Sequence, residues 1–481
     1  DMIPNTGISD HCVSILDEDT ICAVSTPPGV GGIAVIRVSG KKAIPVTDMI
    51  FRPKGKGGDL SHRSSHTLAY GEIYDGAGEV LDEVVVSLFR APHSYTGEDT
   101  VEISCHGSAY IARRIIERLI DSGCRGAAPG EFTRRAFANG RLDLSQAEAV
   151  ADLIASTSAA SHRVAMNQMR GGFSRELADL RARLLKFVSL IELELDFSEE
   201  DVEFADRTQL VALADHIEQV INRLADSFSR GNAIKNGIPT IIIGETNAGK
   251  STLLNRLLRE ERALVSDIHG TTRDTVEDII DLQGVAFRFI DTAGIRETQD
   301  TVESMGIERT FSKLEQADIV LWMIDGTQSD EQLRELADLI VPRCEGKHLF
   351  AIINKTDLLV SEQIENKRNL LETFSIPQKH ILRLSAKNDE DIAGLERTLS
   401  SLAHTGEAQN DTIVTNIRHY EALVRAQESI RRARRGLAEN YPGDLLSQDI
   451  RETMHHLGEI TGEITTDEIL SNIFKNFCVG K

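Results

Sequence analysis

The chain has 481 residues, 41% of them hydrophobic, which is enough for about three domains with substantial cores. Its formal net charge of −22 excludes a protein that coats nucleic acid nonspecifically, because neutralising phosphates requires a broadly basic surface. A local basic patch remains in the run RRARR (Arg431, Arg432, Arg434 and Arg435), which is either a nucleic-acid contact or a solvated helix face.

The cysteines and the start of the chain predict where the protein works. The six cysteines show neither zinc-ligand spacing nor a disulfide framework, which indicates a reducing compartment. No apolar run approaches the ~20 residues that span a bilayer, and residues 1–18 lack the apolar core of a signal peptide. We therefore expect a cytoplasmic protein with no membrane partner, whose fold begins near Asp19.

Residues 1–139 are predicted to form an α+β domain. Prolines and glycines separate short runs that are typical of strands, and one helical run follows them. The strand-like runs are GIAVIRV, HTLAYGEIY, EVVVSLF and TVEISCH, and the helical run is SAYIARRIIERLIDSG. No motif in this domain predicts a catalytic activity by itself, since charged strand residues such as Arg37 and Glu102 are usually surface groups.

Two helical segments, 140–236 and 401–481, flank a central segment and are predicted to fold as one discontinuous domain. The first contains no proline, and apolar residues recur there at helical spacing, namely Leu177, Leu180, Leu184, Phe187, Ile191 and Leu195. A second such pattern runs from Thr208 to Phe228. The later segment contains the long helical run HYEALVRAQESIRRARRGLAENY, and Thr465 with Glu468 predicts a capping box for a last helix.

The inserted segment, 237–400, alternates apolar strands with helices. The runs IPTIIIG, FRFIDT, DIVLWMID and HLFAIINK are typical of buried parallel strands, which predicts a doubly wound α/β domain. Directly after its first strand comes GETNAGKS, residues 244–251, in the strand–loop–helix context that a phosphate-binding loop requires. Its glycines let backbone N–H groups surround phosphates, Lys250 offers a cation to the β/γ-phosphates, and Ser251 offers a hydroxyl to Mg²⁺.

Four further motifs follow in the order that GTPases use: GTTRD (270–274), DTAG (291–294), NKTD (354–357) and SAK (385–387). Asp357 can accept from guanine N1–H and N2–H₂, a donor pair that adenine lacks. One motif alone could be an ordinary turn, but together they predict GTP binding. One residue is unexpected: Ile295 follows DTAG where Ras-like GTPases usually carry a glutamine that orients the attacking water. Either the chain hydrolyses GTP poorly or another group replaces the glutamine.

Several longer stretches point to one family. DTICAVSTPPGVGGIAVIRVSG, SYTGEDTVEISCHG, APGEFTRRAFANGRLDLSQAEAVADLI and EITGEITTDEILSNIFKNFCVGK, together with the nucleotide motifs, resemble the MnmE (TrmE) family of bacterial and organellar tRNA-modification GTPases. The likeness covers nearly the whole chain in the same order. It implies an N-terminal folate-binding and dimerisation domain, and a Ras-like G domain inserted into a helical domain.

For the nucleotide site, the resemblance implies a bound K⁺ whose charge replaces that of an arginine finger. The family's K⁺ ligands map to Asn247, Ser266, Ile268 and Thr271, while Ser251 and Thr272 are expected to ligate Mg²⁺. His269 departs from the small residues common in that loop. The expected GTP contacts are Asn247, Ala248, Gly249, Lys250, Ser251, Thr252, Ser266, Asp267, Ile268, His269, Gly270, Thr271, Thr272, Asp291, Thr292, Ala293, Gly294, Asn354, Lys355, Asp357, Ser385, Ala386 and Lys387.

The resemblance also assigns the water-orienting role to Glu303, with Arg296 ordering the same loop. By itself, Glu303 reads as a solvated residue in the first turn of a helix. The family's folate contacts map to Arg37, Glu102, Arg141 and Lys481, of which Arg141 replaces a more usual lysine and keeps its charge. The ligand would be 5-formyl- or 5,10-methylene-tetrahydrofolate.

The chain ends in CVGK, and the family implies that Cys478 is essential for modification. A thiolate nucleophile and a redox partner are both open as its role. A prenylation motif fits poorly, and a frayed terminus is the plain alternative. The expected activity is GTP- and K⁺-dependent addition of an aminomethyl or carboxymethylaminomethyl group to C5 of the wobble uridine of certain tRNAs. It would act as a homodimer with an FAD-dependent MnmG-type partner. The rivals are an Era/Der-like ribosome-assembly factor and a regulatory GTPase.

Overall fold

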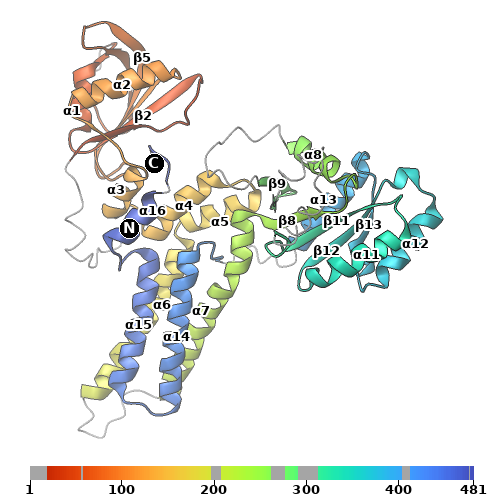
Figure 1. The fold of residues 1–481 in the computed structure, drawn as a ribbon. Helices are drawn as coiled ribbons and strands as arrows, with labels where there is room; N and C mark the ends of the chain where they lie inside the picture. Colours follow the sequence, from red (N-terminus) through yellow and green to blue (C-terminus); the bar gives the residue numbers. More distant parts are fainter. Residues whose placement is uncertain are drawn as a thin grey trace. The chain divides into compact units, whose positions relative to one another are not determined.

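The computed structural model describes residues 19–55, 58–196, 207–261, 277–290, 313–403, 412–475 and 477–480. The chain divides into two compact units, one built from Asp1–Ile154, Met166–Asn222 and Glu421–Lys481, the other from Ala155–Ala165 and Arg223–Tyr420 (Figure 1). The domain boundaries expected at residues 139, 236 and 400 are finer than this division and stay predictions.

The first unit begins with a mostly antiparallel sheet whose strand order is β3-β4-β5-β6-β2-β1-β7. Its strands are β1 (Ile21–Val24), β2 (Ile33–Ser39), β3 (Phe51–Pro53), β4 (Thr67–Tyr74), β5 (Val80–Phe89), β6 (Thr100–His106) and β7 (Arg125–Gly126). All four predicted strands are present, and the predicted helical run forms α2 (Ala109–Asp121). The α+β prediction is therefore confirmed.

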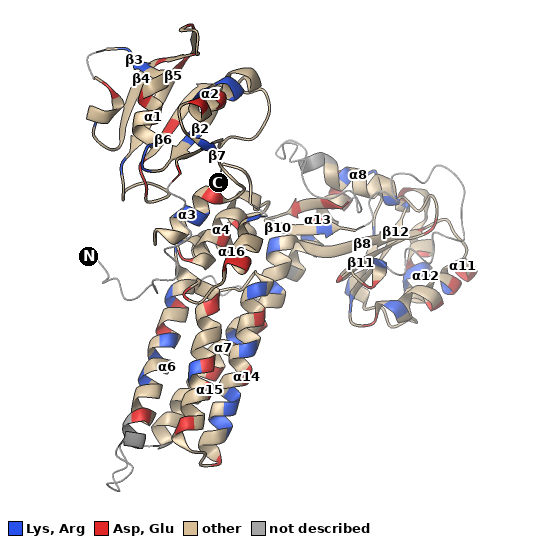
Figure 2. Cartoon of the chain, turned by 60° about the vertical axis from the view of Figure 1, so that its left-hand side comes forward, with Lys and Arg blue, Asp and Glu red and all other residues tan. Residues whose placement is uncertain are grey.

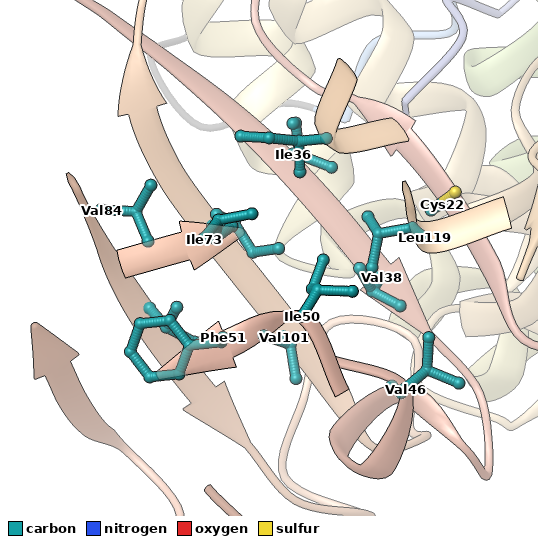
Figure 3. Packing of buried hydrophobic residues seen from close by; sticks show 14 of the residues in the cluster. Cys22, Ile36, Val38, Val46, Ile50, Phe51, Ile73, Val84, Val101 and Leu119 are labelled. Atoms are coloured by element: carbon teal, nitrogen blue, oxygen red, sulfur yellow. The ribbon is translucent and has the colours of Figure 1, made fainter. Parts of the chain in front are cut away.

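One face of this sheet carries the core of the unit's N-terminal part. Alternate residues of the strands point into it, including Ile36, Val84 and Val101, and helices α1 (Ala43–Ile50) and α2 cover them (Figure 3). The opposite face is exposed at β4. Tyr70 and Leu68 on β4 expose 48% and 66% of their surface there. A sheet with one buried and one open face explains the alternation of apolar and polar residues in these strands.

The rest of the unit is helical, as predicted. Its helices are α3 (Glu131–Ala138), α4 (Leu144–Ala155), the end of α5 (Ala159–Met169), α6 (Gly172–Asp196), the first half of α7 (Arg207–Asn236), most of α14 (Ile417–Ala438), α15 (Gly443–Thr461) and α16 (Asp467–Lys475). Five of the six apolar residues expected on one face of α6, from Leu177 to Ile191, are buried, and the side chain of Leu195 lies outside the described residues. The predicted cap of α16 is off by one residue, because Thr466, not Thr465, accepts the N–H of Ile469.

The RRARR run on α14 is ion-paired. Arg431 bonds Glu218 at 3.0 Å, Arg432 bonds Asp449 at 2.9 Å, and Arg434 bonds Asp215 and Glu218 at 2.5 and 3.0 Å. Figure 2 shows these blue segments of α14 among red ones of the neighbouring helices. Three of the four arginines thus have carboxylate partners, which favours a structural role over a nucleic-acid contact.

The second unit holds a sheet of strand order β13-β12-β11-β8-β10-β9. Its elements are β8 (Ile238–Ile243), α8 (Lys250–Glu261), β9 (Asp278–Leu282), β10 (Val285–Phe289), β11 (Ile319–Asp325), α11 (Asp330–Ile340), β12 (His348–Asn354), α12 (Ser361–Glu372), β13 (Ile381–Arg383) and α13 (Asp389–Ala403). The four predicted strands pair in parallel, and the edge strand β9, which the sequence did not predict, runs antiparallel to β10.

This sheet has a core on each face. Ile242, Leu321 and Ile352 point to one core, and their neighbours Ile243, Trp322 and Ile353 point to the other. Burial on both faces explains why these strands read as continuous apolar runs, and it confirms the doubly wound prediction. Among the described helices of the chain, none combines the length and apolar character needed to cross a bilayer.

Candidate functional site

The loop between β8 and α8 requires glycine at two positions. Gly244 has φ +145°, and a Cβ there would lie 2.2 Å from the Met323 carbonyl oxygen. Gly249 has φ +103°, and its Cβ would lie 2.1 Å from Nδ2 of Asn354. Only glycine fits such positions, because any side chain would clash with the neighbouring strands. The loop therefore runs tightly from the end of β8 to the N-terminus of α8, where backbone N–H groups can bind phosphates.

Lys250 folds back over this loop. Its Nζ donates to the carbonyl oxygens of Gly244 and Glu245 at 2.6 and 2.7 Å, and burial lowers the pKa of Lys250 from its ordinary value. A nucleotide phosphate is a stronger acceptor for this cation than neutral carbonyls. Asn247 stands on the outer side of the loop, exposed and with φ +67°, so its amide is open to a ligand.

Asn354 links the phosphate loop to the base-side loop. Its Nδ2 donates to the Ala248 carbonyl at 2.8 Å, and its Oδ1 accepts from the Ala386 N–H at 2.9 Å. Ala386 belongs to the predicted SAK motif, whose Ser385 N–H donates to Asp391 at 2.7 Å. The structure thus brings three of the predicted motifs together around one buried amide.

The other residues of NKTD lie beside it. Lys355 has φ +59° and donates from Nζ to Asp325 at 2.6 Å, which fixes its long side chain against the end of β11. Asp357 is exposed and open to a base. Lys387 is also exposed, and its carbonyl accepts from Arg256 on α8 at 2.7 Å. The predicted residues of the two segments between α8 and β11 lie outside the described residues: Ser266, Asp267, Ile268, His269, Gly270, Thr271, Thr272, Asp291, Thr292, Ala293, Gly294, Ile295, Arg296 and Glu303.

Comparison with known proteins settles the family. The family model of the MnmE helical domain matches residues 144–478, and that of the GTP-binding protein TrmE N-terminus matches residues 20–141. The tRNA modification GTPase MnmE of Bacteroides thetaiotaomicron is 59% identical over 467 residues, covering 97% of this chain and 100% of the relative. The chain belongs to the MnmE family of tRNA modification GTPases.

Another MnmE, from Parabacteroides distasonis, is 58% identical over 466 residues, covering 96% of this chain and 100% of the relative. Among solved structures, the crystal structure of the SsGBP and GDP complex is 20% identical. It covers 47% of this chain and 68% of that one with a TM-score of 0.27, a likeness too partial to bear on the site. Membership of the MnmE family rests on the full-length relatives and confirms the predicted resemblance and GTPase class.

In the first unit of this MnmE-family chain, two of the predicted folate contacts meet. Arg37 on β2 and Glu102 on β6 stand opposite each other, and both Nε and Nη2 of Arg37 lie 2.9 Å from Oε1 of Glu102. The guanidinium also lies 5.1 Å from the ring centre of Tyr95 and 5.6 Å from that of Phe132. Its Nη1 is buried and has no hydrogen-bond partner among the described residues. Such an orphaned donor suits an acceptor group on a ligand.

Tyr95 and Phe132 are site residues that sequence reasoning missed. Both stand in stretches that carry the family resemblance, SYTGED and APGEFT, but an aromatic residue in such a stretch reads as core. Arg141 is exposed, and its side chain lies near Gly97, two residues along the chain from Tyr95, so its folate contact stays a prediction. Lys481 lies outside the described residues.

Behind Phe132, a charged network holds the start of α3. Glu131, 2% exposed, pairs with Arg125 at 2.7 Å and with Arg135 at 3.2 Å, and Arg135 also pairs with Glu98 at 3.1 Å. Burial works to raise the pKa of Glu131, but hydrogen bonds from Arg125 and from the Ala128 N–H prevail and lower it to about 2. The carboxylate therefore stays ionised and anchors α3 to β7.

The five described cysteines are all free, and only Cys478 is exposed. Burial raises the pKa of Cys105 and of Cys344 to about 11, so these thiols stay protonated. Cys478 follows α16 and is the described cysteine with access to a substrate. The exposed thiol agrees with the prediction that it takes part in a reaction, which stays a prediction.

Proposed function

We propose that this chain is a K⁺-activated GTPase that modifies C5 of the wobble uridine (position 34) of certain tRNAs. It would add an aminomethyl or carboxymethylaminomethyl group together with an FAD-dependent MnmG-type partner. The names of its full-length relatives support a tRNA modification role. One observation supports the proposal that a one-carbon group is transferred in the first unit. The tail with the exposed Cys478 lies on β1 and at the start of α3, and both elements border Arg37.

The residues around Arg37 fit a tetrahydrofolate. Glu102 can accept from the pterin amino group, the unpaired Nη1 of Arg37 can donate to an acceptor on the ligand, and Tyr95 and Phe132 offer ring faces. When bound, the folate would supply the one-carbon unit. We propose that Arg141 and Lys481 add cations for its carboxylates.

The nucleotide loops fit GTP with Mg²⁺ and K⁺. Lys250 and the N-terminus of α8 would bind the phosphates, Asp357 would read guanine, and Ser251 and Thr272 would hold Mg²⁺. The exposed amide oxygen of Asn247 suits K⁺, with Ser266, Ile268 and Thr271 completing the site. K⁺ would offset the negative charge that grows on the phosphates, which Lys250 also binds.

Glu303 is proposed to replace the glutamine that is absent at Ile295. A carboxylate can accept a hydrogen bond from water and so orient it toward the γ-phosphate, whereas the isoleucine side chain has no polar atom. Arg296 would order the same segment. GTP hydrolysis would then drive a conformational cycle, and the carbon chemistry would take place in the other unit.

The open face of the N-terminal sheet supports a homodimer. Leu68 and Tyr70 on β4, Val85 on β5 and Ile33 on β2 expose between 37% and 67% of their surface on that face. Large apolar side chains exposed on one face of a sheet are a feature of interfaces. A second copy of the chain would cover it.

The test is mass spectrometry of tRNA nucleosides from a strain that lacks the gene. The strain is then complemented with a gene for the wild-type chain, for Cys478→Ser, or for the control Cys344→Ser, which changes a buried cysteine. We expect the modified wobble uridine to return with the wild type and the control, and to stay absent with Cys478→Ser. Normal modification in the deletion strain itself would favour an Era/Der-like ribosome-assembly factor or a regulatory GTPase.

Folate binding is tested separately by titration calorimetry with 5-formyl-tetrahydrofolate. Arg37→Met keeps the aliphatic length of the side chain and removes its donors, so binding should fall at least about tenfold, the loss expected for a charged hydrogen bond. Arg113→Met, at an exposed arginine on α2, is the matched control and should bind as the wild type does. Equal affinities of both variants would contradict the folate assignment.

A further inference from the structure

We infer that Gly130 and Gly480 are positioning residues, which clamp the C-terminal tail on either side of Cys478 and so fix the place of its thiol. The use of that thiol rests on the proposed function, but the clamp is a property of the fold and is tested by itself. The residues that form it all belong to the first compact unit.

The tail starts from a small core of its own. Leu470 and Phe474 on α16 pack with Leu144 and Ala147 on α4, and Phe477 adds its ring to Phe474 at a centroid distance of 5.2 Å. The Phe477 N–H donates to the Phe474 carbonyl at 3.0 Å, which turns the chain out of the helix. The root of the tail therefore has a fixed position before Cys478 is reached.

Gly130 forms the first half of the clamp. Its N–H donates to the carbonyl oxygen of Cys478 at 3.4 Å, and its φ is +66°. A Cβ at this position would lie 2.8 Å from the Phe474 carbonyl oxygen and 2.9 Å from Cβ of Phe477. The tail thus approaches the backbone of Gly130 more closely than any side chain allows.

Gly480 forms the second half, two residues beyond Cys478. Its φ is +95°, and a Cβ there would lie 2.3 Å from the Val24 carbonyl oxygen, at the end of β1. The Ser25 hydroxyl donates to the Gly480 carbonyl at 3.1 Å. Here the tail lies directly on the backbone of the strand that pairs with β2 and places Ala23 opposite Arg37.

The two contacts leave Cys478 little freedom. Only Val479, itself 55% exposed, separates the residue bonded to Gly130 from the residue seated on Val24. The backbone is held at both ends while the thiol stays exposed. A reacting group fixed in this way gains rate because it does not have to be ordered again in each turnover.

Spin-label spectroscopy tests the clamp directly. A nitroxide is attached to Cys478 in the full chain. Cys12, which lies outside the described residues, is replaced by serine in all samples so that it cannot take the label. The motion of the label is then compared between the otherwise wild-type chain and the variants Gly130→Ala, Gly480→Ala and Gly78→Ala. Gly78 is a matched control, because its φ is +90° but nothing lies within 4 Å of a Cβ there. We expect restricted motion in the wild type and in Gly78→Ala, and fast motion in the two clamp variants.

Activity measurements on unlabelled variants test the positioning role. In Gly480→Ala, tRNA modification should fall by at least about tenfold, as a displaced reacting group predicts, while the GTPase rate stays within about twofold of wild type. Ser25→Ala removes the hydrogen bond to the Gly480 carbonyl but leaves the close backbone contact unchanged. We therefore expect the label to become only slightly more mobile and tRNA modification to fall less than in Gly480→Ala. Ser25→Ala also keeps the proposal testable if Gly130→Ala does not fold.

Two results would overturn the inference: an unchanged spectrum in Gly480→Ala, or full modification despite a mobile label. The proposed function is contradicted by a different result. Normal tRNA modification by Cys478→Ser would show that the thiol is not needed, and it would not change what the spectra of the labelled Cys478 proteins say about the clamp.

Discussion

Asn354 donates a hydrogen bond from Nδ2 to the carbonyl oxygen of Ala248 at 2.8 Å, and so ties the end of β12 to the phosphate-binding loop. The same amide accepts from Ala386 through Oδ1, and the residue is 3% exposed. Because water cannot replace these buried partners, this side chain helps to set the spacing between the phosphate side and the base side of the site, together with Arg256, which donates to the Lys387 carbonyl.

Asn354→Ala is therefore expected to weaken GDP and GTP binding about thirtyfold or more, since two buried hydrogen bonds are worth about 2 kcal/mol or more. Fluorescent nucleotide titration measures the affinity. Asn236→Ala, at an exposed asparagine whose side chain bonds Asn232 on its own helix, should bind as the wild type does. If both variants bound equally well, Asn354 would not set the geometry of the site.

K⁺ activation should depend on the side chain of Asn247. The residue has φ +67°, so alanine there would strain the loop, whereas Asn247→Gly removes the amide and keeps the backbone conformation. We expect GTP hydrolysis by the wild type to be several-fold to tenfold faster in KCl than in NaCl, by charge stabilisation of the transition state, and the variant to lose the difference. A wild-type rate that is the same in both salts would contradict the K⁺ proposal.

Glu303→Ala should slow GTP hydrolysis by about 10²–10³-fold with little change in GTP affinity, because an orienting carboxylate acts mainly in the transition state. Single-turnover hydrolysis and nucleotide titration separate the two effects. Glu297→Ala removes a carboxylate from the same segment and is the control. An unaffected rate in Glu303→Ala would leave the missing glutamine at Ile295 unexplained.

The sequence predicted the G domain well because its signals are local. The central strands β8, β11 and β12 are buried on both faces and read as continuous apolar runs, and Gly244, Gly249 and Lys250 occupy a motif with fixed spacing. The hydrogen bonds of Asn354 could not be read in this way, since they join residues 106 and 32 positions away.

The N-terminal site was harder to predict for the same reason. Arg37 and Glu102 are 65 residues apart, and their pairing depends on the register of β2 and β6. The aromatic neighbours Tyr95 and Phe132 come from a loop and from α3, so no periodicity marks them. The clamp on the tail joins Ser25 to Gly480, and only the folded backbone reveals that the two glycines face close contacts.

Acid should loosen the start of α3 through Glu131. Its pKa is about 2 in the fold against an ordinary value of 4.5, so the ionised carboxylate stabilises the fold fully above pH 4.5. That stabilisation is lost as the pH falls from 4.5 toward 2. One pKa unit corresponds to about 1.4 kcal/mol, so Glu131→Gln should cost on the order of 3 kcal/mol at pH 7 and progressively less below pH 4.5.

Hydrogen–deuterium exchange of the α3 peptide measures this loss locally, without requiring the two units to unfold together. Glu131→Gln should exchange faster than wild type at neutral pH, and the difference should narrow, at matched intrinsic exchange rates, as the pH falls from 4.5 toward 3. Glu117→Gln, which breaks an ion pair of a 46% exposed carboxylate with Arg114, should leave α3 unchanged. A constant difference between Glu131→Gln and wild type down to pH 3 would mean that the carboxylate's charge does not stabilise α3, and that Arg125 and Arg135 hold the helix by packing alone.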